Sequence, residues 1–261
     1  MTERFYGFNR QLPDFRDEFF MFTPKPKIVL PSSVDLRIKG PTPYNQGPLG
    51  SCTGNGTGRI VHYGLLKQSI HVFAPSRLFI YYNERVMEGT VNQDAGASIR
   101  DGIKSIASQG VCDEILWPYD VKKFATKPPV KCFADAKKHK ALLYRPVKQE
   151  LDIMKACLAE GFPIVIGFSV YPSFESEQVA KTGVVPMPNK TESLLGGHCV
   201  TIDGYIDSVQ RFICCNSWGT GWGENGYFSM PYEYLTNPNL ACDFWMIETI
   251  FNSNIHSKNK K

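Results

Sequence analysis

The stretch NQGPLGSC, residues 45–52, decides the fold that we expect for this chain. Its glycines and proline predict a tight turn that ends at Cys52. Beyond the turn, Ile60, Tyr63 and Leu65 recur at roughly helical spacing among several glycines. Glycines weaken a helix but allow another segment to pack closely against it. We therefore expect a tightly packed helix that begins at or just before Cys52.

A cysteine at this position is a candidate nucleophile. Unpaired N–H groups and the helix dipole favour negative charge at a helix N-terminus, which lowers the pKa of a thiol there. The alternative is that Cys52 is a small buried apolar residue, as most free cysteines are. The segment by itself leaves both interpretations open.

The composition is that of a globular protein with one large or two modest domains. The chain has 261 residues, of which 43% are apolar and 21% charged, with a net charge of +4. This charge is too small to indicate a nucleic-acid partner. No apolar run has the length of a membrane span, and the N-terminus has no apolar core of a signal peptide. We expect a monomer without nucleic-acid or membrane partners, either cytoplasmic or intracellular, or packaged in a particle if viral.

The eight cysteines do not suggest a metal site. No Cys-x-x-Cys pair occurs, which argues against structural zinc. Metal binding by His198 together with Cys199 is also disfavoured, because adjacent strand residues point to opposite faces. We expect no metal ion and no cofactor. Without an export signal the thiols are expected in a reducing compartment, although the disulfide state stays open.

The order of the chain predicts an α+β fold with two subdomains. Residues 1–29 are rich in proline and aromatic residues and are expected to form an extended leader lying on the protein body. Residues 30–140 are predicted to be helical, with helices at 74–87 and 97–108, and residues 141–251 to be strand-rich after a helix at 150–160. The expected strands are 164–170, 200–205, 211–215 and 243–248. Residues 252–261 are expected to form a disordered basic tail.

Two polar residues of the second half are candidate partners for Cys52. His198 follows a Gly-Gly turn and enters an apolar strand, where a structural role is the alternative. Asn216 lies at a strand end and is followed by Trp218 and Trp222 among four glycines. An asparagine oxygen can accept the imidazole N–H and fix its tautomer, so that the other nitrogen faces the thiol. A tryptophan over that bond would exclude water.

These motifs together resemble the papain-like, cathepsin-like cysteine proteases. They are Gln46 with GSC at 50–52, GH at 197–198 and NSWGTGWGENGY at 216–227. The separations from Cys52 are 198 − 52 = 146 and 216 − 52 = 164 residues, near the family's usual spacing. The resemblance extends from about residue 30 to 250. It implies a helical left half, an antiparallel, β-barrel-like right half and an active-site cleft between them.

The resemblance also implies roles for single residues. Cys52 would attack the peptide carbonyl, His198 would act as base and then acid, and Asn216 would orient His198. The expected reaction is hydrolysis of a peptide or protein substrate through a thioester. Rival functions are acyl transfer or amide hydrolysis by the same triad, and a non-catalytic binding protein on this scaffold.

Three further residues have expected roles by the same resemblance. Gln46 would donate its amide N–H to the oxyanion hole beside the N–H of Cys52. Trp218 would shield the contact between the histidine and the asparagine. Gly96 is the expected place where substrate backbone pairs as an extended strand.

The chain departs from the family at several positions. Leu49 replaces a usual cysteine, so the family's disulfide from that position is not expected, and Gly197 stands where many relatives carry Asp or Asn. A leader of about 29 residues replaces the long helical prosegment. Short leaders with a Pro-Asp-x-Arg-Asp element resemble a branch found in bacteria, archaea and large DNA viruses. We expect this leader to cross or edge the cleft and to restrain activity until it is moved or cut.

Overall fold

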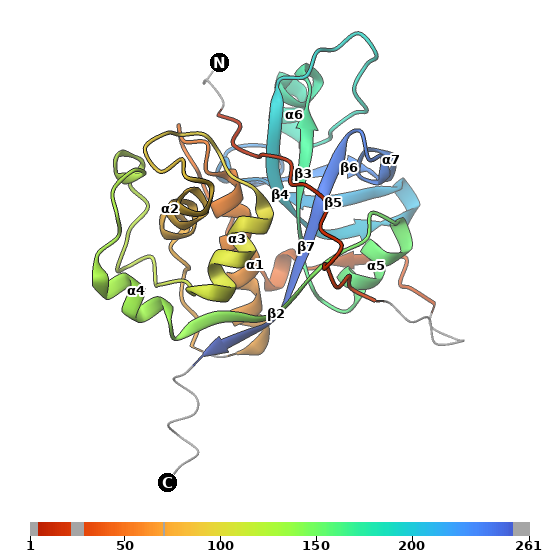
Figure 1. Ribbon diagram of the computed structural model, residues 1–261. Coiled ribbons are helices and arrows are strands. Elements are labelled where there is room, and N and C mark those ends of the chain that lie inside the picture. Colours follow the sequence, from red (N-terminus) through yellow and green to blue (C-terminus); the bar gives the residue numbers. More distant parts are fainter. Residues whose placement is uncertain (1–4, 22–28, 70, 253–261) are drawn as a thin grey trace.

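The computed structural model describes residues 5–21, 29–69 and 71–252 (Figure 1). Its α-helices are α1 Cys52–Gln68, α2 Arg77–Glu88, α3 Ile99–Ser108, α4 Val130–Ala136, α5 Leu151–Ala159, α6 Glu177–Thr182 and α7 Tyr232–Thr236. The short 3-10 helices are η1 Arg37–Lys39, η2 Val121–Lys123, η3 Pro172–Glu175 and η4 Asp207–Val209. The strands are β1 Ser33–Asp35, β2 His139–Pro146, β3 Ile164–Val170, β4 Gly196–Ile206, β5 Arg211–Cys215, β6 Tyr227–Pro231 and β7 Ala241–Asn252.

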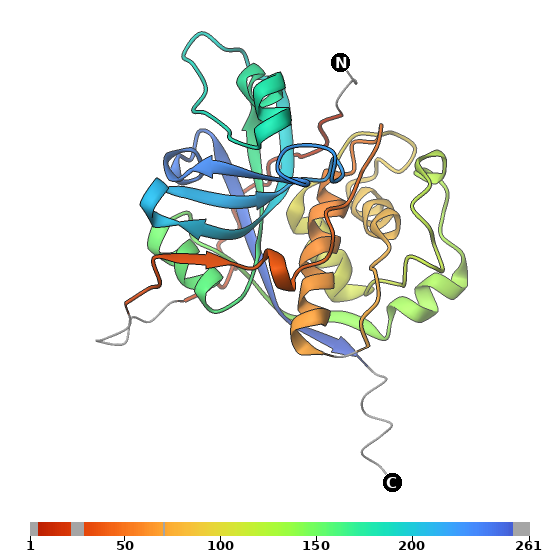
Figure 2. The same cartoon turned by 180° about the vertical axis from the view of Figure 1, so that it is seen from behind.

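The strands form one antiparallel sheet in the order β2-β7-β3-β4-β5-β6, with β1 paired to β4. Helices α1 to α4 gather on one side of the molecule and most of the sheet on the other, as Figure 1 and the reverse view in Figure 2 both show. The α+β fold class is therefore confirmed. The sheet is not closed into a barrel, because β2 and β6 end the strand order without pairing to each other within the described residues.

Local sequence signals explain where the helices begin. The hydroxyl of Ser76 accepts the N–H of Phe79 and caps α2, so this helix begins at Arg77 and not at residue 74. Ser98 caps α3 in the same way through the N–H of Asp101. The expected strands 164–170 and 211–215 have these bounds in the structure. The expected subdomain boundary near residue 140 falls inside β2 and stays a prediction, and the tail from residue 253 lies outside the described residues.

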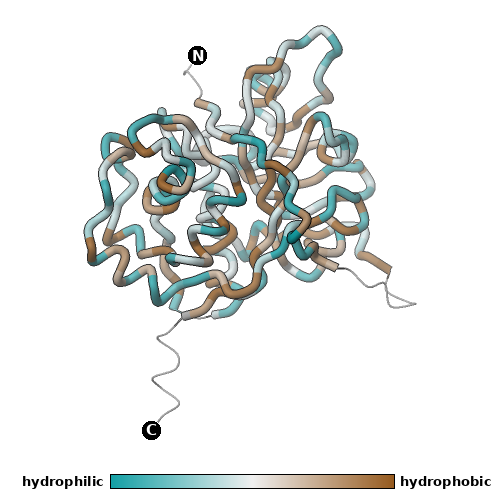
Figure 3. Tube along the Cα trace, viewed as in Figure 1, coloured by the Kyte–Doolittle hydropathy of each residue, from teal (hydrophilic) through white to brown (hydrophobic). Residues whose placement is uncertain are grey.

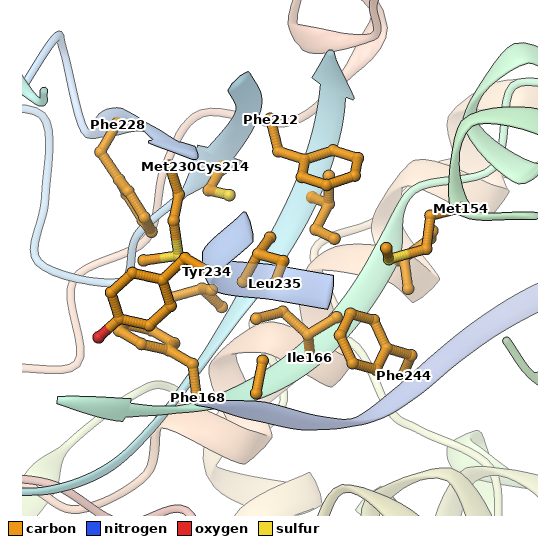
Figure 4. Close-up of a cluster of buried hydrophobic side chains, with 14 of the residues drawn as sticks. Met154, Ile166, Phe168, Phe212, Cys214, Phe228, Met230, Tyr234, Leu235 and Phe244 are labelled. Atoms are coloured by element: carbon orange, nitrogen blue, oxygen red, sulfur yellow. The ribbon is translucent and has the colours of Figure 1, made fainter. Parts of the chain in front are cut away.

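Two hydrophobic clusters make up the core. One lies within the sheet and is built on Phe168, Phe228 and Met230 (Figure 4). The other joins α1, α2 and α3 to β7 and includes Ile103 and Trp245. Figure 3 shows hydrophobic segments along the central strands. Within the described part of the chain, no helix is both long and apolar enough to cross a membrane.

Helix α1 packs directly on the sheet because its glycines leave no side chain in the way. A Cβ atom on Gly56 would lie 2.9 Å from the Cys199 sulfur of β4. One turn further, the Arg59 guanidinium forms a buried ion pair of 2.6 Å with Asp203, also on β4. Arg59 also donates to the carbonyl of Pro41, and the Thr201 hydroxyl donates to the second oxygen of Asp203. This buried pair connects the helices to the sheet.

We expect Arg59→Met to destabilise the fold by about 3–5 kcal/mol, because removing one partner of a buried ion pair leaves the other charge uncompensated. Urea unfolding measures this change in the free energy of unfolding. The control is Lys181→Met, which removes an exposed ion pair with Glu177 and should cost less than about 1 kcal/mol. Equal effects of the two substitutions would contradict the structural role of the buried pair.

Candidate active site

Cys52 is the first residue of α1, as the sequence indicated. Its side chain is fully buried, and burial raises the pKa of its thiol to about 12. The backbone N–H groups of Cys199 and Gly7 act in the opposite direction and lower it. The expectation of a depressed thiol pKa is therefore wrong for this conformation. The cause is the complete burial of the sulfur, which keeps water away from it.

His198 and Asn216 lie together on neighbouring elements. His198 is on β4 and Asn216 directly follows β5, and the imidazole Nε2 is 2.9 Å from the Asn216 side-chain oxygen. The same oxygen accepts the backbone N–H of Ser217 at 2.8 Å, which fixes the orientation of the amide. The Cys199 N–H that acts on the Cys52 thiol belongs to the residue after His198. The histidine segment of β4 thus borders the N-terminus of α1.

Aromatic rings enclose the imidazole. Trp218 stacks on His198 with a centroid distance of 5.0 Å and an interplanar angle of 27°. Phe168 on β3 and Tyr6 of the leader present edges to the same ring, at 5.8 and 5.9 Å. His198 is completely buried and Trp218 is 8% exposed. The bond between the imidazole and the amide therefore lies in a region that excludes water, where hydrogen bonds are stronger.

Gln46 is held beside the turn that precedes Cys52. Its oxygen accepts the hydroxyl of Ser217 at 2.6 Å, and its Nε2 donates to the Leu49 carbonyl at 2.8 Å. The same Nε2 donates to the leader carbonyl of Phe5 at 3.2 Å. The amide group that the sequence suggested as an oxyanion donor thus already binds a peptide carbonyl oxygen.

Gly96 lies where the leader crosses the helical side. The carbonyl of Gly7 accepts the N–H of Ala97 at 2.8 Å, and the N–H of Asn9 donates to the Ala97 carbonyl at 2.9 Å. A Cβ atom on Gly96 would overlap the Gly7 carbonyl. On the opposite side, the N–H of Phe8 donates to Gly197 at 3.0 Å. An extended peptide therefore lies between the segment of Gly96 and the strand of His198.

The described part of the leader continues along the surface after this crossing (Figure 1). Gln11 binds Asp243 through its N–H at 2.8 Å and accepts the indole N–H of Trp245 at 3.2 Å. Asp17 then forms two hydrogen bonds with the guanidinium of Arg100, at 2.5 and 2.7 Å. The leader is thus bound at both ends of residues 5–17. Residues 22–28, which belong to the expected leader, lie outside the described residues.

Sequence reasoning did not identify the leader residues that contact the site. Tyr6, Gly7 and Phe8 have no motif that distinguishes them from other aromatic or glycine residues. Only the need to cover exposed aromatic side chains indicated that this segment packs on the body. No group of three or more His, Cys, Asp and Glu side chains within the described residues could hold a metal ion.

This fold and arrangement are those of a cysteine peptidase. The family model for papain family cysteine proteases matches residues 30–243, so the chain belongs to this family and is a hydrolase acting on peptides or proteins.

The similar proteins include viral, bacterial and protozoan ones. An uncharacterized peptidase C1-like protein of Acanthamoeba polyphaga mimivirus is 41% identical over 273 aligned positions, covering 95% of this chain and 88% of the relative. The crystal structure of xylellain, a cysteine protease from Xylella fastidiosa, is 43% identical with a TM-score of 0.86, covering 94% of this chain and 96% of that one. Cysteine proteinase 1 of Entamoeba histolytica is 29% identical, covering 79% of this chain and 65% of the relative.

Proposed function

We propose that this peptidase uses Cys52 as nucleophile, His198 as general base and then acid, and Asn216 to orient His198. The observation that carries the proposal is the 2.9 Å contact between the imidazole Nε2 and the Asn216 oxygen, stacked under Trp218. Because this contact engages Nε2, Nδ1 is the nitrogen that exchanges a proton with the Cys52 thiol. The enzyme acts as a monomer, and its mild net charge of +4 supports the absence of a nucleic-acid partner.

The reaction proceeds in two steps. His198 takes the thiol proton, and the sulfur of Cys52 forms a bond to the substrate carbonyl carbon. The C–N bond then breaks as the imidazolium gives its proton to the leaving amine, which leaves a thioester on Cys52. Water attacks the thioester with His198 as base, and the acid product and the free thiol are released.

Charge on the carbonyl oxygen needs donors fixed in advance. The Gln46 amide is such a donor, because Ser217 and Leu49 bind its two ends and the side chain is 1% exposed. The N–H of Cys52 at the start of α1 is the second donor, since first-turn N–H groups have no partner within the helix. Removing one such donor typically costs about 3 kcal/mol of transition-state stabilisation.

The leader restrains this activity by occupying the positions of a substrate. Its Phe5 carbonyl binds the Gln46 amide, its Gly7 N–H acts on the Cys52 thiol, and its Phe8 N–H binds Gly197. With the leader in place the thiol pKa of about 12 keeps the sulfur protonated at neutral pH. Displacement of the leader readmits water and lowers the cost of forming the thiolate.

Labelling with a peptidyl vinyl sulfone, followed by mass spectrometry, tests the assignment of the nucleophile. We expect the reagent on Cys52 and on none of the other seven cysteines, and we expect the labelling to be lost in His198→Ala. The matched control is Cys242→Ala, because Cys242 is partly exposed whereas the other seven described cysteines are buried. Labelling at Cys242 in place of Cys52 would contradict the proposal.

A further inference from the structure

A fully buried acid, Glu84 on α2, lies directly behind the nucleophile. One of its carboxyl oxygens accepts the hydroxyl of Thr53 at 2.7 Å, and Thr53 is the residue that follows Cys52 in α1. The other oxygen has no hydrogen-bond partner within the described part of the chain. Glu84 is 0% exposed, so water does not supply the missing partner at the surface. None of the catalytic roles above uses this residue.

The nearest cation on the same helix does not neutralise Glu84. The guanidinium of Arg85 instead donates to the carbonyls of Val91 at 2.7 Å and Phe124 at 2.5 Å. It also lies 4.0 Å from the ring centroid of Tyr81. Arg85 is therefore bound in another direction, and Glu84 forms no ion pair among the described residues.

Helix α3 closes the other side of the carboxyl group. A Cβ atom on Gly102 would overlap the unpaired oxygen of Glu84 and would lie 2.9 Å from the hydroxyl of Thr57. The acid is thus packed against a glycine backbone, with two uncharged threonines on α1. A carboxylate in such a place would have one hydrogen bond and no counter-ion, and buried groups of this kind bind a proton.

We infer that Glu84 is a positioning residue held as a neutral acid behind Cys52, and that its ionisation opposes formation of the Cys52 thiolate. The inference rests on the proposed role of Cys52. Both Cys52 and its neighbour Cys199 lie close enough to Glu84 for a charge there to make their thiolates less favourable. Once Glu84 ionises at alkaline pH, its charge thus makes the Cys52 thiolate less favourable, and Thr53 connects the two residues.

The charged groups around Glu84 agree with a neutral form at neutral pH. The pKa of Glu84 is raised to about 8, mainly by burial. Glu88 on the same helix and Asp101 on α3 also raise it, while the Thr53 hydroxyl and Arg85 act to lower it. Glu88, whose own pKa burial raises to about 7, accepts the N–H of Ser98. Below pH 8 the proposed thiolate has no negative neighbour at this site, and above pH 8 it has one.

The first test is the pH dependence of the melting temperature of the full chain with Glu84→Gln. The folded pKa of Glu84, about 8, is above the ordinary value of 4.5 for a glutamate, so its stabilising contribution is complete below pH 4.5 and is lost as the pH rises to about 8. The variant lacks this titration. We expect the melting temperature of the variant relative to the parent chain to rise by on the order of 5 °C between pH 5 and pH 8. A difference in melting temperature that stays constant between pH 5 and pH 8 would overturn the inference that Glu84 is a neutral acid.

The second test measures the rate of Cys52 labelling by the vinyl sulfone between pH 6 and pH 10. Up to about pH 8 we expect the labelling rates of Glu84→Gln and the parent chain to depend on pH in the same way. Above pH 8 we expect Glu84→Gln to be labelled about fivefold faster than the parent chain, because a shift of the thiol pKa by less than one unit has this effect. The control is Glu177→Gln, an acid whose side chain is 88% exposed, which should follow the parent chain. A flat ratio for Glu84→Gln would overturn the coupling to Cys52.

A further variant keeps the test decisive if Glu84→Gln does not fold. Thr53→Val removes the hydroxyl that lowers the pKa of Glu84, so the bend that ionisation of Glu84 causes in the pH profile of Cys52 labelling should move to higher pH. An unmoved profile would overturn the inference. If no chain is labelled at Cys52, the proposed nucleophile is wrong, and the melting curves still decide whether Glu84 binds a proton.

Discussion

Replacement of Cys52 by alanine is expected to abolish peptide hydrolysis, with a fall in kcat on the order of 10⁵-fold, as for removal of the nucleophile in other triads. The reason is that, in the proposed mechanism, Cys52 supplies the atom that bonds to the substrate carbonyl. Asn216→Ala should lower kcat less, by on the order of 10²-fold. The imidazole remains stacked on Trp218, so the ring loses its hydrogen bond but keeps its place.

The comparison uses a fluorogenic peptide with the full chain, and again with Gly7 replaced so that the leader does not conceal a difference. Cys242→Ala is the matched control, because this thiol borders the leader near Asp243 but has no catalytic role in the proposal. It should keep the activity of the parent chain. Residual hydrolysis above a few per cent in Cys52→Ala, or an equal loss in Cys242→Ala, would show that another group is the nucleophile.

Replacement of Gly7 by valine is expected to raise the hydrolysis rate of the full chain by at least about tenfold. A Cβ atom at this position would overlap the carbonyl group of Gly50, which belongs to the rigid turn before Cys52. Backbone atoms in such a turn move little, so the leader has to move away from its position beside Cys52. A loss of only about 1.4 kcal/mol in the docking of the leader increases the open fraction tenfold.

Phe15→Ala is the control within the leader, because Phe15 is 99% exposed and its loss should not alter the rate. Deletion of residues 1–29 provides a second comparison and should raise the rate at least as much as Gly7→Val. The isolated peptide of residues 5–21, added to the deleted chain, should lower the rate again. An unchanged rate in both Gly7→Val and the deletion would remove the idea that the leader restrains the enzyme.

Much of the fold follows from local signals in the sequence. The β-branched run of residues 164–170 forms β3 with these bounds, and the glycine-rich segment after Cys52 forms a helix packed closely on β4. The β-barrel-like right half that the resemblance implied is an open sheet in the structure, because β2 and β6, which end the strand order, do not pair within the described residues. Strand periodicity carries no information about such pairing.

The residues proposed for catalysis were also found from the sequence, because each stands in a motif that only a special local conformation explains. Cys52 follows a glycine-rich turn, His198 follows two glycines, and Asn216 precedes a loop of tryptophans and glycines. The distances between these three residues could not be predicted from local motifs. The contact of Asn216 with His198 joins residues 18 positions apart through the pairing of β4 with β5.

The sequence by itself determined the family, the start of the helix at Cys52 and the polar residues that can take part in peptide hydrolysis. Only the tertiary structure decided the state of these groups. The electrostatic environment of a thiol depends on everything that surrounds it, and here Gly7 of the leader and Glu84 of α2 come from distant parts of the chain. Burial raises the pKa of the Cys52 thiol above the value that a helix N-terminus in water would give it. A charge on Glu84 also raises this pKa, whereas the N–H of Gly7 lowers it.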